Sequence, residues 1–214
     1  MRMTLVQRYR WVYKPLIWLA CLAPLLIILA AAFGVPGVSL TADPVRETLH
    51  RLGRTALNLL LITLCVTPLK DLLKAPQLLR LRRLLGLFAF SYALLHFVAF
   101  AALDLRLDWG RIGSELLKRP YILVGFTALL ALLPLAATST QRMMRRLGRR
   151  WVKLHRLVYP IALLGVWHFW WQVKADITEP LLYGVALAVL LAYRVGKLRR
   201  TTSMSAPATA PGKT

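Results

Sequence analysis

Three histidines lie inside or beside long apolar stretches of this sequence. His96 lies within one apolar run, whereas His155 and His168 lie near the two ends of another, WVKLHRLVYPIALLGVWHFWW (151–171). Ionisable groups inside membrane segments are costly, so they mark functional sites by default. Because imidazole is also an axial ligand of haem iron, the pattern indicates electron transfer through a membrane-bound haem.

Two of the three histidines are expected at one depth in the membrane. The helical rise of about 1.5 Å per residue places His96 roughly 20 Å above Arg83 and His168 roughly 22 Å above Lys153. Two imidazoles that face each other can fill both axial positions of a haem, which favours electron transfer over substrate binding. An alternative stays open, in which each histidine only hydrogen-bonds a neighbouring helix.

His155 is expected near the inner surface, away from this pair. Its spacing from His168 corresponds to a rotation of about 220° around a straight helix, so the two would not share a face. Pro160 lies between them and could bend the helix. No Cys-x-x-Cys-His motif is present, so covalent haem attachment is not expected.

The elements that must position these histidines are apolar helices. Hydrophobic residues make up 58% of the 214 residues and charged residues 17%, which is typical of membrane proteins. A spanning helix needs about 20 mostly apolar residues, and six runs meet this approximately, so the sequence predicts an all-α, six-helix membrane bundle. The runs are 15–33, 53–69, 84–103, 120–137, 154–173 and 180–196.

The net charge of +21 orients this bundle. When the N-terminus is placed in the cytoplasm, most of the 29 Lys and Arg fall in inner segments, whereas only Asp71 among the 8 acids does. Short loops rich in Lys and Arg stay in the cytoplasm, so both termini are expected inside and no nucleic acid is needed. Residues 1–14 are then an inner arm, 15–200 the membrane domain, and 201–214 a disordered tail without apolar periodicity.

Several other polar residues have more than one interpretation. Arg54, early in the second run, could neutralise a haem propionate or extend to the headgroups. Arg82 and Arg83 could mark the inner boundary of the third helix or bind an anionic cofactor. His50 is expected to be solvated near the outer surface.

Two segments, GLFAFSYALLH (86–96) and KLHRLVYPIALLGVWH (153–168), resemble the ferric-reductase-like transmembrane family. In that family the third and fifth helices commonly carry two histidines each, which hold an inner and an outer haem. The resemblance implies a complete outer site in His96 and His168. It places the inner position of the third helix at Arg82, which cannot ligate iron, so the inner site is altered and retains only His155 as a possible second metal ligand.

Within the family, the chain most resembles the haem-binding membrane subunits of periplasmic methionine sulfoxide reductase systems. The resemblance implies haem b and bound FMN in the inner membrane of a bacterium. It also implies that electrons from the quinone pool, or from a cytosolic flavin reductase, pass to a periplasmic molybdenum-containing catalytic subunit that performs the sulfoxide chemistry. The matching segments are GRTALNLLLITLCVTPL (53–69), RLRRLLGL (80–87) and TSTQRMMRRLGRRWVKLHRLVYP (138–160).

The position of FMN follows as a hypothesis from the altered inner site. Arg82, Arg83 and His155 could hold its phosphate by charge-assisted hydrogen bonds. Two other functions remain open. The first is a stand-alone ferric or cupric reductase with an exposed haem edge, and the second is a transporter or assembly factor whose histidines relay protons or bind a metal.

Overall fold

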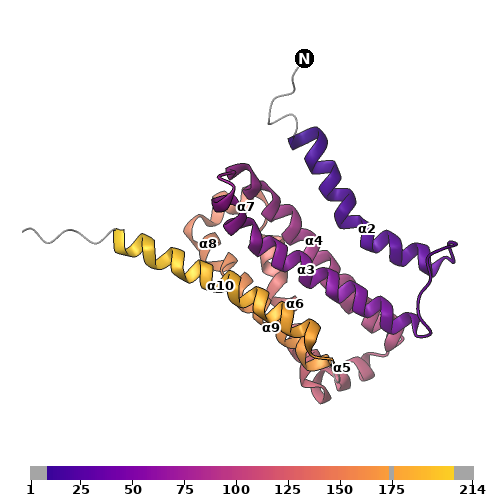
Figure 1. The fold of residues 1–214 in the computed structure, drawn as a ribbon. Helices are drawn as coiled ribbons and strands as arrows, with labels where there is room; N and C mark the ends of the chain where they lie inside the picture. The colour runs from indigo at the N-terminus through magenta and orange to yellow at the C-terminus, as the bar shows by residue number, and fades with distance from the viewer. Residues whose placement is uncertain (1–8, 174–175, 205–214) are drawn as a thin grey trace, which may run out of the picture.

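The computed structural model describes residues 9–173 and 176–204, and these form a bundle of helices with no strand among them (Figure 1). Short π or 3-10 segments, labelled η, extend or precede several helices. The elements are η1 (Tyr9–Tyr13), α2 (Lys14–Ala32), α3 (Pro44–Leu72), η2 (Pro76–Arg80), α4 (Leu81–Ala99), η3 (Phe100–Asp104), α5 (Trp109–Lys118), α6 (Pro120–Ala137), α7 (Gln141–Leu147), α8 (Arg149–His155), α9 (Val158–Gln172) and α10 (Thr178–Met204).

Five helical stretches of the described chain are long and apolar enough to cross a membrane. The run predicted at 154–173 is not among them, because it is divided between α8 and the 15-residue α9. The prediction of an all-helical membrane fold is therefore confirmed, with five candidate spans rather than six. They are Trp11–Ala32, Pro44–Leu72, Pro76–Asp104, Pro120–Ala137 and Thr178–Arg199.

The break between α8 and α9 lies just before Pro160 rather than at it. The N–H of Arg156 bonds the carbonyl of Lys153 (3.2 Å), and the N–H of Tyr159 bonds the carbonyl of Arg156 (3.1 Å). These bonds span three residues, so the chain is tighter here than in an α-helix. Pro160 has no N–H to offer the carbonyl of Arg156, which explains why the regular pattern fails at this point.

Helix α3 is longer at both ends than the run 53–69. At its outer end, Asp43 accepts a hydrogen bond from the N–H of Arg46 (3.1 Å) and Pro44 occupies the first turn, a combination that starts helices. At its C-terminal end the helix continues through Pro68 to Leu72, three residues beyond the predicted run. His50 and Arg54 therefore lie within a helix.

The chain ends also differ from the expected boundaries. Part of the predicted inner arm is helical, since η1 leads directly into α2, and residues 1–8 lie outside the described chain. Helix α10 continues to Met204, beyond the boundary expected at 200. The rest of the predicted tail, 205–214, lies outside the described residues.

Helices α3, α4, α6 and α9 form the centre of the bundle, whereas α2 and α10 lie at its edges (Figure 1). A hydroxyl group joins α2 to this centre. Tyr92 on α4 donates to the carbonyl of Cys21 (2.6 Å) and accepts from the N–H of Leu25 (3.1 Å). Helix α2 is bent (Figure 1) and contains Pro24 next to these two backbone groups, and an internal proline is a usual cause of such a bend.

Candidate functional site

A cavity of about 440 Å³ lies between α3, α4, α6 and α9. This volume falls in the range of about 300–1,000 Å³ that is usual for ligand and cofactor pockets. Apolar side chains such as Leu57, Leu60, Leu132 and Ile161 line its deeper part. A cavity of this size and lining suits a large, mostly apolar ligand.

His96 from α4 and His168 from α9 both line this cavity. Their ring centres are 6.2 Å apart and their ring planes are inclined by 76°. Ligand nitrogens on opposite sides of one metal ion lie about 4 Å apart, so the centres of two such imidazoles would lie roughly 6 Å apart. The structure thus brings the predicted pair together at a separation that fits two axial ligands of one iron.

Each ring is held by a backbone carbonyl of a neighbouring helix. His96 Nδ1 lies 2.9 Å from the carbonyl oxygen of Leu49 on α3, and His168 Nδ1 lies 2.6 Å from that of Tyr121 on α6. A carbonyl oxygen can only accept, so Nδ1 must carry the proton in both rings. Nε2 of each ring therefore keeps its lone pair, which is the form that binds a metal.

A glycine lies one helical turn after each of these carbonyls. A Cβ atom placed on Gly53 would lie 3.1 Å from His96 Nδ1, and one placed on Gly125 would lie 2.7 Å from His168 Nδ1. Any larger residue would push the ring away from its carbonyl. The two glycines therefore allow the imidazoles to approach the neighbouring helices closely.

Three arginines lie at the outer opening of the cavity: Arg46, Arg54 and Arg119. Arg54, singled out from the sequence, does line the cavity and also pairs with Glu179 (2.9 Å). A hydrogen bond to the Tyr121 hydroxyl (3.2 Å) raises the pKa of Arg119 above its ordinary value. Arg119 also pairs with Glu115 (2.6 Å), and Asp43 and Asp104 line the same cavity, so the opening holds both cationic and acidic side chains.

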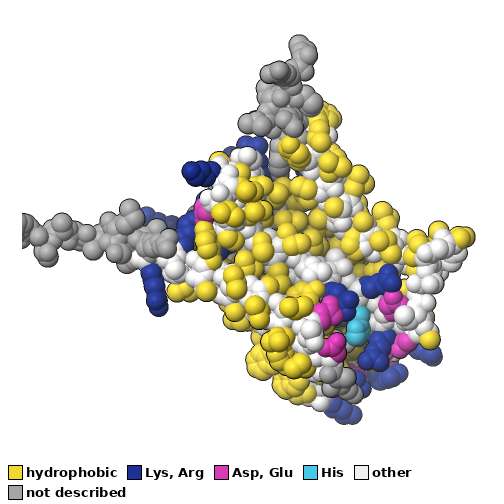
Figure 2. All heavy atoms as spheres, in the orientation of Figure 1, with side chains coloured by type: hydrophobic (Ala, Val, Ile, Leu, Met, Phe, Trp, Pro, Cys, Tyr) yellow, Lys and Arg dark blue, Asp and Glu magenta, His cyan; other side chains and the backbone are white. Residues whose placement is uncertain are grey.

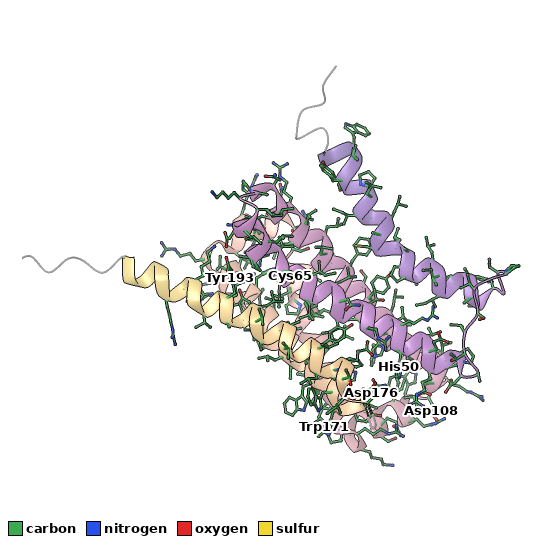
Figure 3. All side chains as sticks on the ribbon, in the orientation of Figure 1. His50, Cys65, Asp108, Trp171, Asp176 and Tyr193 are labelled. Carbon is green, nitrogen blue, oxygen red and sulfur yellow. The ribbon has the colours of Figure 1, made fainter. Side chains whose placement is uncertain are left out.

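His50 also lies at this opening, contrary to the expectation that it is solvated. It is half-buried, and the Gln172 amide lies 3.0 Å from its Nε2. Figure 2 shows a hollow on this face with a histidine among basic and acidic side chains, and Figure 3 labels His50 at the same place. A third histidine thus belongs to the cavity, but at its opening.

The inner end of the bundle is built differently. His155 stacks on Trp151 at 3.8 Å between ring centres, and its Nδ1 lies 3.1 Å from the Trp151 carbonyl. Arg82 is half-buried within electrostatic reach of His155, whereas Arg83 is exposed. The structure therefore places Arg82 with His155, as expected, and leaves Arg83 at the periphery.

Arg194 was not singled out from the sequence, where it is one of the many Lys and Arg of the inner segments. Its guanidinium lies within electrostatic reach of Arg82 and donates to the Tyr159 hydroxyl (2.9 Å) and to the Leu64 carbonyl (3.3 Å). One signal was available, since Arg194 interrupts the last apolar run. Gly53 and Gly125 were also missed, because their importance depends on which helices pack together.

A family model described as the ferric reductase like transmembrane component matches residues 52–166. The chain belongs to this family. The match includes His96 and His155 and ends just before His168. The family resemblance expected from the motifs around these histidines is confirmed.

Relatives of known role are similar over most of their length. The protein-methionine-sulfoxide reductase heme-binding subunit MsrQ of Xanthomonas campestris is 58% identical over 173 residues, which cover 79% of each chain. MsrQ of Xanthomonas oryzae is 51% identical over 203 residues, 94% of this chain and 93% of the relative. MsrQ of Caulobacter vibrioides is 45% identical over 193 residues, 90% of each chain. No solved structure matches.

Proposed function

We propose that this chain is the haem-carrying membrane subunit of a methionine sulfoxide reductase system and that it conducts electrons across the bilayer. The observation that carries this proposal is the pair of facing imidazoles, His96 and His168, in one large cavity. The relatives in Xanthomonas and Caulobacter are named as heme-binding subunits of such a reductase, which agrees with a haem in this cavity.

The residues of the cavity fit haem b. His96 and His168 would hold the iron through their Nε2 atoms, and Arg46, Arg54 and Arg119, which line the same cavity, would neutralise the propionates. When bound, the haem supplies one-electron oxidation and reduction. With both histidines as its ligands, the iron would offer no open position to oxygen or another substrate, and its role would be to pass electrons on.

The proposed topology has six membrane crossings with both termini in the cytoplasm of a bacterium, whose inner membrane holds the chain. The 15 residues of α9 correspond to about 22 Å, and α8 and the intervening turn lead into them from the inner side. The concentration of Lys and Arg in the inner segments supports this orientation. The haem cavity then opens toward the periplasm.

Electrons enter at the inner end in this proposal. FMN would bind there, with Arg82 and His155 as the residues that would hold its phosphate, and Arg83 lies at the rim. The donor is the quinone pool or a cytosolic flavin reductase. A second haem at His155 would need an opposing ligand, and the family position for that ligand is Arg82, which cannot ligate iron. The acceptor is a periplasmic molybdenum-containing catalytic subunit, on which the methionine sulfoxide is reduced.

One kinetic experiment tests the acceptor. The purified protein is reduced stoichiometrically with dithionite, and the haem absorbance is followed after addition of an oxidised periplasmic methionine sulfoxide reductase catalytic subunit. We expect rapid oxidation of the haem by the partner and a much slower reaction with ferric citrate.

The same experiment tests a second candidate function, reduction of iron or copper chelates. The outer opening of the cavity favours this candidate, because a haem edge there would be accessible from the periplasm. Oxidation by ferric citrate as fast as oxidation by the catalytic subunit would support the chelate reductase and contradict the proposed partner.

A further inference from the structure

Two guanidinium groups reach the same part of α3 at the inner end of the bundle, because Arg194 donates to the Leu64 carbonyl and Arg82 on α4 is level with the next turn of α3. Arg82 on α4 is half-buried, and among the described residues its side chain makes no hydrogen bond and no ion pair. Its main electrostatic neighbours are Arg194, which carries the same charge, and Tyr159. Two half-buried like charges without a counter-ion repel each other, and a bound anion would relieve that repulsion.

Arg194 is held in a fixed orientation. Residue 68 is a proline and has no N–H, so the carbonyl of Leu64 loses its usual helical donor. Arg194 Nη2 donates to this carbonyl at 3.3 Å, and Nη1 donates to the Tyr159 hydroxyl at 2.9 Å. A guanidinium has five N–H donors, so donors remain for a further ligand.

A buried hydroxyl without a partner lies at the same level of the bundle. Thr67 is 8% exposed, and its Oγ1 has no hydrogen-bond partner among the described residues. A Cβ on Gly86 would lie 3.9 Å from Thr63 Cγ2, and α3 runs antiparallel to α4, so position 82 is level with Thr67. Buried hydroxyls are almost always paired, which suggests that this one meets a ligand.

The acid of this region, Asp71, already pairs with other side chains. Asp71 pairs with Lys70 (2.6 Å) and Lys197 and accepts from the Tyr193 hydroxyl (2.8 Å). Figure 3 labels Tyr193 and Cys65, which mark this part of α10 and α3. Asp71 therefore does not neutralise Arg82 and Arg194.

We propose that Arg82 and Arg194 form a binding site for a phosphate group at the inner end of the bundle. The planar guanidinium matches phosphate oxygens with paired hydrogen bonds, Thr67 adds a hydroxyl donor, and Tyr159 positions Arg194. The phosphate belongs to FMN or to the headgroup of an anionic phospholipid. The first source rests on the proposed function, whereas the second does not.

A competing account is that Arg194 serves only to satisfy the Leu64 carbonyl. Pro68→Ala separates the two roles, because alanine restores the N–H that this carbonyl lacks. The double variant Pro68→Ala with Arg194→Gln therefore keeps the backbone satisfied but removes the charge. Arg199→Gln is the matched control, since Arg199 is an exposed residue of the same helix.

The experiment measures binding to delipidated, haem-loaded protein with three probes: FMN, riboflavin and phosphatidylglycerol. Flavin affinity is measured by fluorescence quenching, and lipid binding by native mass spectrometry. Loss of one charge-assisted hydrogen-bonding group is expected to weaken phosphate binding about tenfold. We expect that loss in Arg82→Gln and in the double variant, and wild-type affinity in Arg199→Gln.

The probes also distinguish the two sources. FMN bound more tightly than riboflavin would identify a cofactor phosphate, and retained phosphatidylglycerol would identify a headgroup. Unchanged binding in both Arg82→Gln and the double variant, or wild-type protein that binds neither FMN nor phosphatidylglycerol better than riboflavin, would overturn the site. The haem spectrum of the same samples reports separately on the proposed function, so failure of one is distinguishable from failure of the other.

Discussion

The two ends of this bundle, which in the proposed topology are its outer half around His96 and its inner half around His155, use the same chain segments for different chemistry. Helix α4 contributes His96 to the outer half and Arg82 to the inner half, and the α8–α9 segment contributes His168 and His155 at the same two levels. In the outer half two imidazoles face each other. In the inner half the corresponding residues are an imidazole and a guanidinium, and a guanidinium repels cations and attracts anions.

The residues that surround these side chains also differ between the two halves. Outside, each imidazole lies against a glycine and a backbone carbonyl, in a cavity with apolar walls. Inside, His155 stacks on an indole, and Arg82 and Arg194 form no ion pair with an acid among the described residues. Arg82 stands where the family resemblance expects a histidine, and the side chains around it differ from those of the outer half. The outer half therefore suits an iron macrocycle, and the inner half suits a phosphate.

Apart from variants that remove a ligand, the largest loss of haem affinity is expected for Gly125→Ala. Its Cβ would lie 2.7 Å from His168 Nδ1, so the ring must leave its carbonyl. Overpacking costs about 1–3 kcal/mol, which corresponds to about 5- to 150-fold in haem affinity. Haem titration into the apoprotein measures this change.

Gly113→Ala is the control for that variant, because a Cβ at Gly113 meets nothing within 4 Å. Both substitutions favour helix formation by up to about 1 kcal/mol, so improved helix propensity cannot explain a difference between them. Equal haem affinity in the two variants would contradict the role given to Gly125.

A smaller loss of haem affinity is expected for Gly53→Ala. Its Cβ would lie 3.1 Å from His96 Nδ1, a distance that a shift of a few tenths of an ångström relieves. The cost is about 1 kcal/mol, at the lower end of the range for overpacking. The same haem titration should rank Gly53→Ala between Gly113→Ala and Gly125→Ala, and a larger loss than in Gly125→Ala would break the expected order.

The smallest effect on haem is expected for His155→Ala. This residue lies in the inner half, so the haem content and the visible spectrum should match those of wild type, while the FMN content falls. Pyridine haemochrome analysis and flavin fluorescence of the same preparation measure both. A substantial loss of haem would show that the two halves are not separate sites.

The sequence predicted the parts of this architecture that depend on local pattern and on depth. The run 120–137 coincides with α6, because its apolar residues are bounded by proline and by polar residues. His96 and His168 meet as predicted, since helical rise alone fixes their depth. The first turns of α3, before residue 53, were missed because the prediction followed runs of apolar residues. Asp43 and Pro44, which start this helix, precede the apolar run.

Other features depend on pairing between distant helices. Gly53 and Gly125 matter only because α3 packs on α4 and α6 on α9, which sequence periodicity does not reveal. Arg194 donates to the Leu64 carbonyl, 130 residues away in the chain, and Pro68 leaves this carbonyl without its usual helical donor. The bend near Pro160 was anticipated, but its position was set by the hydrogen bonds that precede the proline.

The measurement that tests the central claim most directly is haem content per chain in wild type, His96→Ala and His168→Ala, with His50→Ala as the control. His50 lines the same cavity, but its Nε2 lies beside the amide of Gln172. We predict a b-type spectrum in wild type, its loss in both ligand variants, and its retention in His50→Ala. Retention of the full wild-type haem signal in either His96→Ala or His168→Ala would contradict the claim that these two side chains hold one iron.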